Sequence, residues 1–340
     1  MRMHDLDSFL AKLLAKSGDT PDRLLQLLIA IQKRYSHIPQ EAIEYLSEHL
    51  EIPPVQIYSV IEYYAFLDRV PRGEYDIRFS DNITDRMLGN RALMEGMCKK
   101  LGVEPGVPRP DGKVTVEMTS CTGLCDQGPA LLVNGIAVSK LTEERIHKMV
   151  GLIEAGVPVS KWPKRFFIIE DHILRRDLLL NKRLIKGSAI DAFIVRGSDS
   201  ILDWLDESGL RGRGGAGFKA GTKWRFCRDA EADERYVVCN ADEGEPGTFK
   251  DRVLLTSYAD SVFEGMTLCG GVVGAKKGFL YLRGEYLYLL KSLENTLQER
   301  RDANLLGKNI NGQEGFDFDI EIHLGAGAYV CGEESALIES

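Results

Sequence analysis

The sequence has 340 residues, a formal net charge of −8, and ordinary fractions of hydrophobic (44%) and charged (28%) side chains. The acidic balance and the lack of a basic stripe argue against nucleic-acid binding, and no run of about eighteen apolar residues predicts a membrane span. The seven cysteines are an odd number in a chain that opens without the apolar run of a secretory signal. We therefore expect a cytoplasmic protein whose thiols are reduced or bind metal.

Residues 1–73 are predicted to form a helical lead. Apolar residues recur at helical spacing from Leu6 to Leu14, and a second apolar stretch covers residues 24–31. Thr20-Pro21 marks the start of one helix and Pro53-Pro54 the start of another. Three helices are expected in this segment.

Residues 74–157 alternate between strand and helix patterns and predict a small α/β domain. Strands are expected at 75–79, 113–118, 130–133 and 136–138, and helices at 86–101 and 142–153. Asn134-Gly135, between the last two strands, is typical of a type I′ hairpin. Residues 158–187 are predicted to be a linker.

Residues 188–340 predict an open, mostly parallel, Rossmann-like sheet. Strands are expected at 236–240, 278–283 and 318–324, and helices at 200–205, 253–271 and 286–301. Ligands of such sheets bind at the carboxyl ends of the strands. The loops at that edge are therefore the candidate binding site.

The first candidate loop, residues 209–218, contains five glycines and two arginines. Glycine-rich backbone lets N–H groups approach an anion closely, and arginine adds charge and forked donors. Lys223 follows the loop. A phosphate-bearing ligand is the first hypothesis, and a flexible glycine loop without a ligand is the alternative.

The second and third candidate loops, residues 240–251 and 325–335, are rich in carboxylates. Carboxylates repel phosphate but accept hydrogen bonds from the hydroxyls, imides and carboxamides of nucleotides. The three loops together therefore indicate a ligand with both phosphate and polar rings. The alternatives are a solvated turn at Asp242-Glu243 and a helix start complemented by Glu333 and Glu334.

Residues 207–218 resemble the flavin-phosphate loop of the NADH-oxidising flavoprotein subunit of respiratory complex I, and residues 240–252 and 325–340 match that family's second and third signatures. In the family these loops hold flavin mononucleotide (FMN) with NADH stacked on it. Lys219-Ala220 stands where the family usually has Pro-Thr, which changes loop stiffness rather than a donor.

The resemblance implies a role for each matching position. The flavin phosphate would be surrounded by Gly212, Arg213, Gly214, Gly215 and Lys223. The ribityl chain and ring would be held by Asn240, Asp242, Glu243, Gly332 and Glu333. The NADH side would be lined by Phe218, Phe226, Glu245, Tyr329 and Glu334. No side chain is expected to act as a nucleophile or general acid, because the flavin carries the redox chemistry.

Residues 58–73 and the motif Cys121-Thr122-Gly123-Leu124-Cys125 resemble the thioredoxin-like two-iron ferredoxin subunit of complex I. That family holds its cluster with four thiolates, and its first two cysteine positions fall on Ser80 and Asp85 here. Cys121 and Cys125 are the candidate metal ligands. Two thiolates are too few, so we expect that the two-iron cluster is lost from this domain.

The fusion of these two modules resembles the flavin-bearing diaphorase subunits of cytoplasmic NAD-reducing nickel-iron hydrogenases. The resemblance implies a thioredoxin-like domain followed by an FMN- and NADH-binding domain, and hydride transfer between NAD(H) and FMN. Electrons would pass one at a time to or from an iron–sulfur subunit, with nickel-iron hydrogenase subunits as partners. The family continues past residue 340 into a domain with a four-iron cluster, so we expect an N-terminal portion or a truncated form.

Two other interpretations remain open from the sequence. The chain could be the equivalent subunit of complex I or of an NAD-dependent formate dehydrogenase. Alternatively, the chain could be a non-catalytic assembly module that binds a nucleotide.

Overall fold

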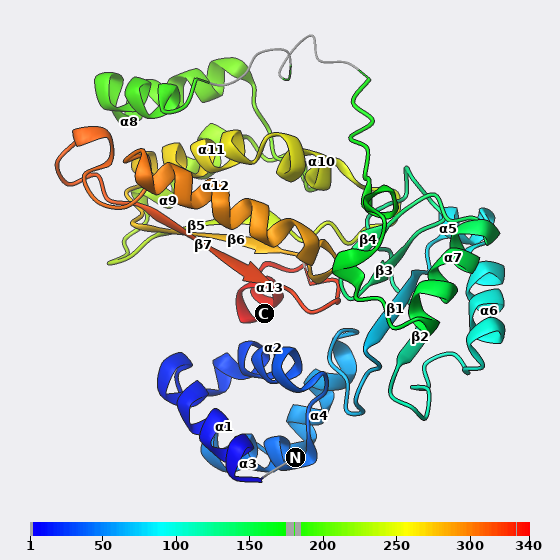
Figure 1. The fold of residues 1–340 in the computed structure, drawn as a ribbon. Coiled ribbons are helices and arrows are strands. Elements are labelled where there is room, and N and C mark those ends of the chain that lie inside the picture. The colour runs from blue at the N-terminus through cyan, green and yellow to red at the C-terminus, as the bar shows by residue number, and fades with distance from the viewer. Residues whose placement is uncertain (1–2, 175–179, 181–184, 331) are drawn as a thin grey trace.

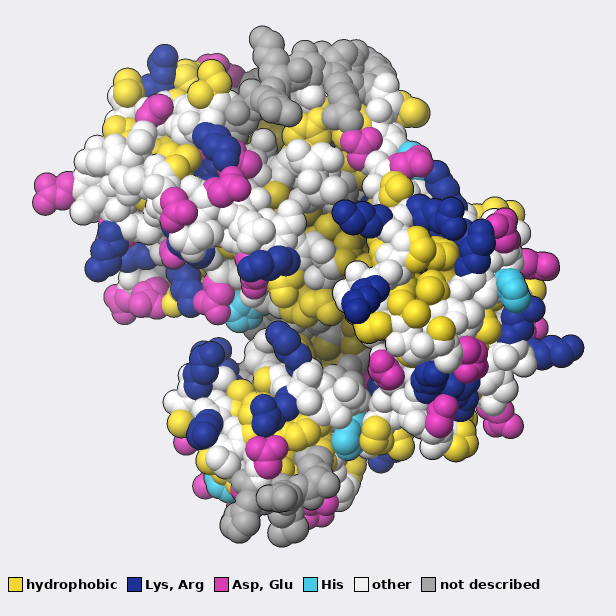
Figure 2. Space-filling view, in the orientation of Figure 1, with side chains coloured by type: hydrophobic (Ala, Val, Ile, Leu, Met, Phe, Trp, Pro, Cys, Tyr) yellow, Lys and Arg dark blue, Asp and Glu magenta, His cyan; other side chains and the backbone are white. Residues whose placement is uncertain are grey.

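The computed structural model describes residues 3–174, 180, 185–330 and 332–340. The chain forms three parts, a helical lead, a domain built on a four-stranded sheet, and a domain built on a three-stranded parallel sheet (Figure 1). Hydrophobic side chains gather where the three parts meet (Figure 2). None of the described helices is both long and apolar enough to cross a membrane.

The helical lead has one more helix than the sequence pattern predicts. Its helices are α1 (Met3–Ser17), α2 (Leu24–Tyr35), α3 (Gln40–His49) and α4 (Pro54–Tyr63), with a 3-10 turn at Pro21–Arg23 before α2. The missed helix, α3, buries only Ala42, Ile43 and Leu46. So short an apolar stripe gives a weak periodic signal, and the packing of the other helices against it decides its formation.

The second part has the strand order β2-β1-β3-β4. Strand β1 (Tyr75–Ser80) is parallel to β2 (Val114–Thr119) and antiparallel to β3 (Leu131–Val133), which forms a hairpin with β4 (Ile136–Val138). Asn134 and Gly135 both have positive φ angles, of 49° and 75°. The predicted type I′ hairpin is confirmed.

Helices α5 (Ile83–Met87), α6 (Asn90–Leu101) and α7 (Glu143–Glu154) complete this domain. The single helix predicted from Arg86 to Leu101 is wrong, because Gly89 adopts a φ of 82° and separates α5 from α6. Within the predicted linker, Trp162 and Phe166 lie in or beside short 3-10 turns (Val159–Lys161, Lys164–Phe167) and pack into the core of this domain. Residues 175–179 and 181–184 of that linker lie outside the described residues.

The third part confirms the mostly parallel sheet. Strands β5 (Tyr236–Ala241), β6 (Lys277–Leu282) and β7 (Asp319–Leu324) are all parallel, with β6 in the middle. Around them lie α8 (Ser188–Ser208), α9 (Ala220–Asp229), α10 (Lys250–Ser257), α11 (Ala259–Val273), α12 (Leu290–Asp302) and α13 (Glu334–Glu339), with 3-10 turns at Gly284–Leu289 and Ile310–Gly312. The parallel order brings the carboxyl ends of all three strands to one edge.

Two predicted helices of this domain need correction. The helix predicted over 253–271 is two helices, α10 and α11, because Tyr258 leaves the helical region with φ −137° and ψ 25°. The helix predicted from Tyr286 begins as a 3-10 turn and becomes α-helical only at Leu290. The break at Tyr258 contains no proline or glycine that would have marked it in the sequence, whereas the 3-10 turn before Leu290 begins at Gly284.

Candidate functional site

The second and third loops meet directly at the carboxyl edge of the parallel sheet. The Val330 N–H donates to Asp242 Oδ2 over 3.3 Å, and the Tyr329 hydroxyl donates to Glu245 Oε1 over 2.9 Å. A Cβ atom at Gly244 would lie 2.6 Å from the Tyr329 ring, so only glycine allows this approach. The two carboxylate-rich loops thus form one surface.

The helical lead supports the third loop from behind. The Phe66 N–H donates to the carbonyl of Ala326 over 3.0 Å, and the Tyr63 hydroxyl donates to the carbonyl of Tyr329 over 3.2 Å. Ala326 and Val330 are buried in the same hydrophobic core as the helices of the lead. The position of Tyr329 therefore depends on a segment more than 250 residues earlier in the chain.

The glycine-arginine loop folds back on itself before α9. Arg211 and Lys219 form an isolated antiparallel bridge, and the Gly212 N–H donates to the carbonyl of Phe218 over 2.8 Å. Within the part of the chain that the structure describes, the N–H groups of Gly214 and Gly215 donate to no protein acceptor. Both glycines are exposed. These N–H groups are therefore available to an anion.

Lys223, on α9, connects the first loop with the third. Its Nζ lies 3.5 Å from Glu334 Oε1, and both side chains are exposed. The rings of Phe218 and Phe226 lie next to each other, with ring centroids 6.3 Å apart in an edge-on arrangement. Two exposed aromatic rings side by side are a surface on which a planar ring can pack.

The second loop contains two buried carboxylates with different roles. Glu243 accepts the N–H groups of Asp251 and Arg252 at the start of α10, and also the Tyr286 hydroxyl over 2.9 Å. Its bonds are thus internal, so the side chain holds the loop on α10. Burial raises the pKa of Asp242 to about 6, although the hydrogen bond from Val330 opposes the rise.

The remaining predicted flavin contacts lie around these two carboxylates. The Asn240 amide oxygen accepts the Asp242 N–H over 3.1 Å, and the Glu333 carboxylate accepts the Ser335 N–H at the start of α13. Gly332 is exposed and lies beside the Tyr329 ring, to which a Cβ would approach 3.0 Å. The roles of these residues toward a ligand stay predictions.

Arg283, which the sequence reasoning missed, sits between the two loops at the end of β6. It is buried and donates to the backbone carbonyls of Glu243 and Cys121 and to the Glu285 carboxylate at 2.7 Å. Its position in the sequence could have identified Arg283, because Arg283 directly follows β6, the middle strand, at the carboxyl edge of the sheet. Arg283 links the candidate site to the four-stranded domain.

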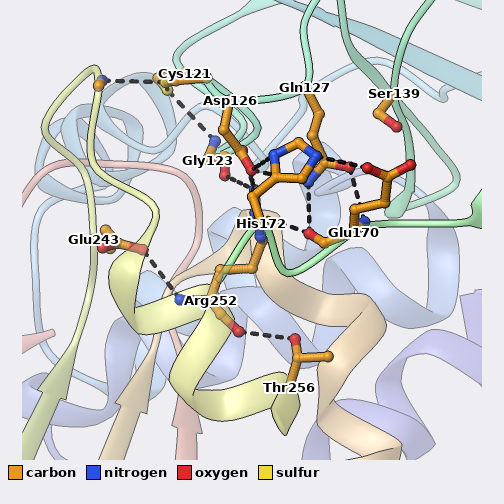
Figure 3. Close-up of polar contacts among 12 residues, drawn as sticks. Cys121, Gly123, Asp126, Gln127, Ser139, Glu170, His172, Glu243, Arg252 and Thr256 are labelled. Carbon is orange, nitrogen blue, oxygen red and sulfur yellow. Dashed lines mark hydrogen bonds and ion pairs between the residues drawn. The ribbon is translucent and has the colours of Figure 1, made fainter. Parts of the chain in front are cut away.

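A second buried arginine joins the same two domains (Figure 3). Arg252, on α10, makes two hydrogen bonds to the Asp126 carboxylate, of 2.7 and 2.8 Å, and one to the Gly123 carbonyl. His172 Nδ1 lies 2.9 Å from Asp126 Oδ2, the oxygen that Arg252 Nη2 also contacts. Gly123 has a φ of 72°, and a Cβ there would collide with the Tyr286 hydroxyl.

The residues at the predicted iron–sulfur position do not fit a two-iron cluster. Cys121 Sγ and Cys125 Sγ are 3.2 Å apart and supply two thiolates at a position where the cluster needs four. Asn82 donates to Ser80 Oγ, to Asp85 Oδ2 and to Cys121 Sγ, so the family's other two ligand positions are bonded to each other through an amide. Among the described residues, no group of three His, Cys, Asp or Glu side chains converges as metal ligands.

The donor set of the three loops does fit FMN. Free N–H groups and a lysine suit its single phosphate, carboxylates suit ribityl hydroxyls and ring N–H groups, and the exposed phenylalanines suit a planar ring. Residues 205–340 match the Nuo51 FMN-binding domain, and residues 10–154 match the thioredoxin-like [2Fe-2S] ferredoxin. The two matches thus cover the carboxyl-terminal and the amino-terminal part of the chain separately.

Proteins that are similar to this chain include subunits of a hydrogenase and of an NADH dehydrogenase. The HoxS subunit alpha of the NAD-reducing hydrogenase of Cupriavidus necator is 38% identical over 98% of this chain and 58% of its own length. The mitochondrial NADH dehydrogenase (ubiquinone) flavoprotein 1 of Dictyostelium discoideum is 37% identical over 67% of this chain and 47% of its own length.

A crystal structure of an NAD⁺-reducing [NiFe]-hydrogenase in the air-oxidised state is similar over nearly the whole chain. It superposes with a TM-score of 0.83 and 39% identity, over 95% of this chain and 55% of that chain. The present chain thus spans somewhat more than half the length of these hydrogenase relatives. The likeness covers all three parts of the fold.

Proposed function

We propose that the three loops bind FMN and NAD(H), and that the chain is the flavin-bearing diaphorase part of an NAD-reducing hydrogenase. Bound FMN supplies the ability to accept a hydride from nicotinamide and to release its two electrons singly. The observation that carries the proposal is the meeting of the carboxylate-rich loops at Tyr329–Glu245, with Lys223 beside Glu334. Cation, carboxylates and aromatic rings lie around one edge of the sheet.

In this proposal the phosphate of FMN sits on the glycine-arginine loop. The N–H groups of Gly214 and Gly215, with Arg213 and Lys223, would hold it, and binding would replace the weak exposed pair of Lys223 with Glu334. Asn240, Asp242, Gly332 and Glu333 would orient the ribityl chain and ring. Glu243 would act indirectly, since its oxygens fix the loop on α10.

NADH would pack on the open side of the flavin. Phe218 and Phe226 would stack on its rings, and Glu245 would accept its polar hydrogens while Tyr329 holds the Glu245 carboxylate in place. Glu334, released from Lys223, would accept from a ribose hydroxyl. No residue of this chain needs to move a proton to the nicotinamide during hydride transfer.

The partners follow from the same proposal. Electrons would leave to, or arrive from, an iron–sulfur subunit and nickel-iron hydrogenase subunits in a cytoplasmic hetero-oligomer. Support comes from the likeness to the hydrogenase alpha subunit over 98% of the chain. A complex isolated with a tag on this chain should contain a nickel-iron subunit, and a quinone-linked partner set would instead favour the complex I alternative.

The test compares FMN with riboflavin, which lacks the phosphate. The chain should bind FMN, seen as quenching of flavin fluorescence, and NADH should bleach the bound flavin. Replacing Lys223 with Gln should weaken FMN binding about 10-fold to 100-fold, because a charge-assisted hydrogen bond contributes about 1.5–3 kcal/mol, and leave riboflavin binding unchanged. Lys308→Gln, at another exposed lysine, is the matched control.

Two results would contradict parts of this proposal. Equal losses of FMN and riboflavin affinity in Lys223→Gln would remove Lys223 from the phosphate. Tight FMN binding with no bleaching by NADH would leave a nucleotide-binding module without the oxidoreductase activity.

A further inference from the structure

Two thiols stand in contact where the ferredoxin family has its cluster. Cys121 Sγ and Cys125 Sγ are 3.2 Å apart, and both cysteines are free. A disulfide bond is about 2.05 Å long, so the sulfurs need to approach by only about 1 Å. The two thiols are therefore already placed for a redox reaction of their own.

The two thiols differ in access. Cys121 is buried and accepts hydrogen bonds from the Asn82 amide and from the Gly123 N–H, each at 3.4 Å. Cys125 is only partly buried. A small reagent can therefore reach Cys125 first, whereas Cys121 is held behind it.

Cys125 is also joined to the candidate site. The Gly247 N–H, on the second loop, donates to Cys125 Sγ over 3.1 Å. Gly247 lies two residues after Glu245, the carboxylate that the Tyr329 hydroxyl contacts. A change at Cys125 is thus transmitted through one hydrogen bond to the loop proposed to face NADH.

We propose that Cys121 and Cys125 form a reversible disulfide that responds to low-molecular-weight disulfides. The Cys125 thiolate attacks one sulfur of R–S–S–R, which gives a Cys125–S–S–R mixed disulfide and releases RS⁻. The Cys121 thiolate then attacks Cys125 Sγ, closes the intramolecular disulfide and releases the second RS⁻. The two cysteines lose two electrons and two protons in total, and R–S–S–R becomes two RSH.

The disulfide weakens the tie to the second loop. A sulfur in a disulfide is a poorer acceptor than a thiolate or thiol, and Cys125 Sγ moves toward Cys121. The Gly247 N–H loses its partner, and the segment carrying Glu245 becomes less well fixed. The reduced pair therefore favours NADH binding, and the oxidised pair raises the KM for NADH; this consequence rests on the proposed function, whereas the disulfide itself does not.

The disulfide is tested by mass spectrometry on the FMN-loaded chain exposed to oxidised glutathione. Wild-type protein should lose two hydrogens, with residues 121 and 125 joined in one cross-linked peptide. Cys121→Ser should instead retain one glutathione on Cys125, because the second step is blocked. Cys98→Ser, at a buried thiol of α6, should behave as wild type.

The regulatory consequence has its own readout. Oxidised wild type should show a KM for NADH at least about 3-fold above that of the reduced protein, reversed by reduced glutathione, and Cys125→Ser should show no such change. Unmodified Cys125 in Cys121→Ser would overturn the disulfide. A disulfide that forms without any change in the KM for NADH would overturn only the proposed coupling to the second loop. If NADH does not reduce the bound flavin, the proposed function is contradicted, but the mass-spectrometric evidence for the disulfide still stands.

Discussion

The Arg252–Asp126 pair gives the sharpest stability prediction, because both groups are buried at the junction of the two domains. The side chains are 1% and 7% exposed, and they make two short hydrogen bonds. Replacing Arg252 with Met leaves the Asp126 carboxylate buried without its main partner. Breaking a buried pair in this way costs about 3–5 kcal/mol.

A double-mutant cycle measures this cost. Urea unfolding, followed by tryptophan fluorescence, should show a loss of about 3–5 kcal/mol in Arg252→Met and a smaller net loss when Asp126→Asn is added to it, because the second change removes the stranded charge. Arg225→Met is the matched control, since Arg225 pairs with the exposed carboxylates of Asp203 and Asp206. That variant should lose less than about 1 kcal/mol.

The reasoning fails if Arg252→Met costs no more than Arg225→Met. It also fails if the losses of Arg252→Met and Asp126→Asn simply add in the double variant. Either result would mean that water reaches the junction and screens the pair.

Three further predictions concern the candidate site and its supports. The folded-state pKa of Asp242 is about 6 against an ordinary 3.8, so the stability that its protonated carboxyl contributes is complete below pH 3.8 and is lost as the pH rises through 6. Urea unfolding should therefore show the unfolding free energy of wild type falling by about 2.4 kcal/mol relative to Asp242→Asn between pH 4 and pH 7. Parallel curves for the two proteins would refute the raised pKa. Gly123→Ala should lower the free energy of unfolding, measured by thermal unfolding, by about 2–4 kcal/mol, since it adds a collision with Tyr286 to the strain of a positive φ. The control Gly156→Ala, where φ is also positive but the space around the residue is open, should lower it by only about 1 kcal/mol. Phe226→Ala should change the unfolding free energy by less than about 0.5 kcal/mol, because the ring is 66% exposed, yet raise the KM for NADH several-fold; a stability loss without a change in KM would make the ring structural.

The amino-acid sequence by itself determined the local features of this chain. The pair Asn134-Gly135 strongly favours a type I′ turn, because both residues tolerate a positive φ, and the structure contains that turn. The alternation of strands and helices after residue 188 also determined the parallel order of β5, β6 and β7. Because parallel strands end at one edge, the loops after β5 and β7 had to lie near each other.

Only the tertiary structure decided how the loops are held and how Cys121 and Cys125 are placed relative to each other. Arg252, Arg283 and Cys125 make their deciding contacts with residues more than 100 positions away, and no local pattern records such contacts. The break at Tyr258 contains no proline or glycine that would have marked it in the sequence. Short-range propensity sets turns and strands within a few residues, whereas burial and charge pairing across domains depend on the whole chain being folded.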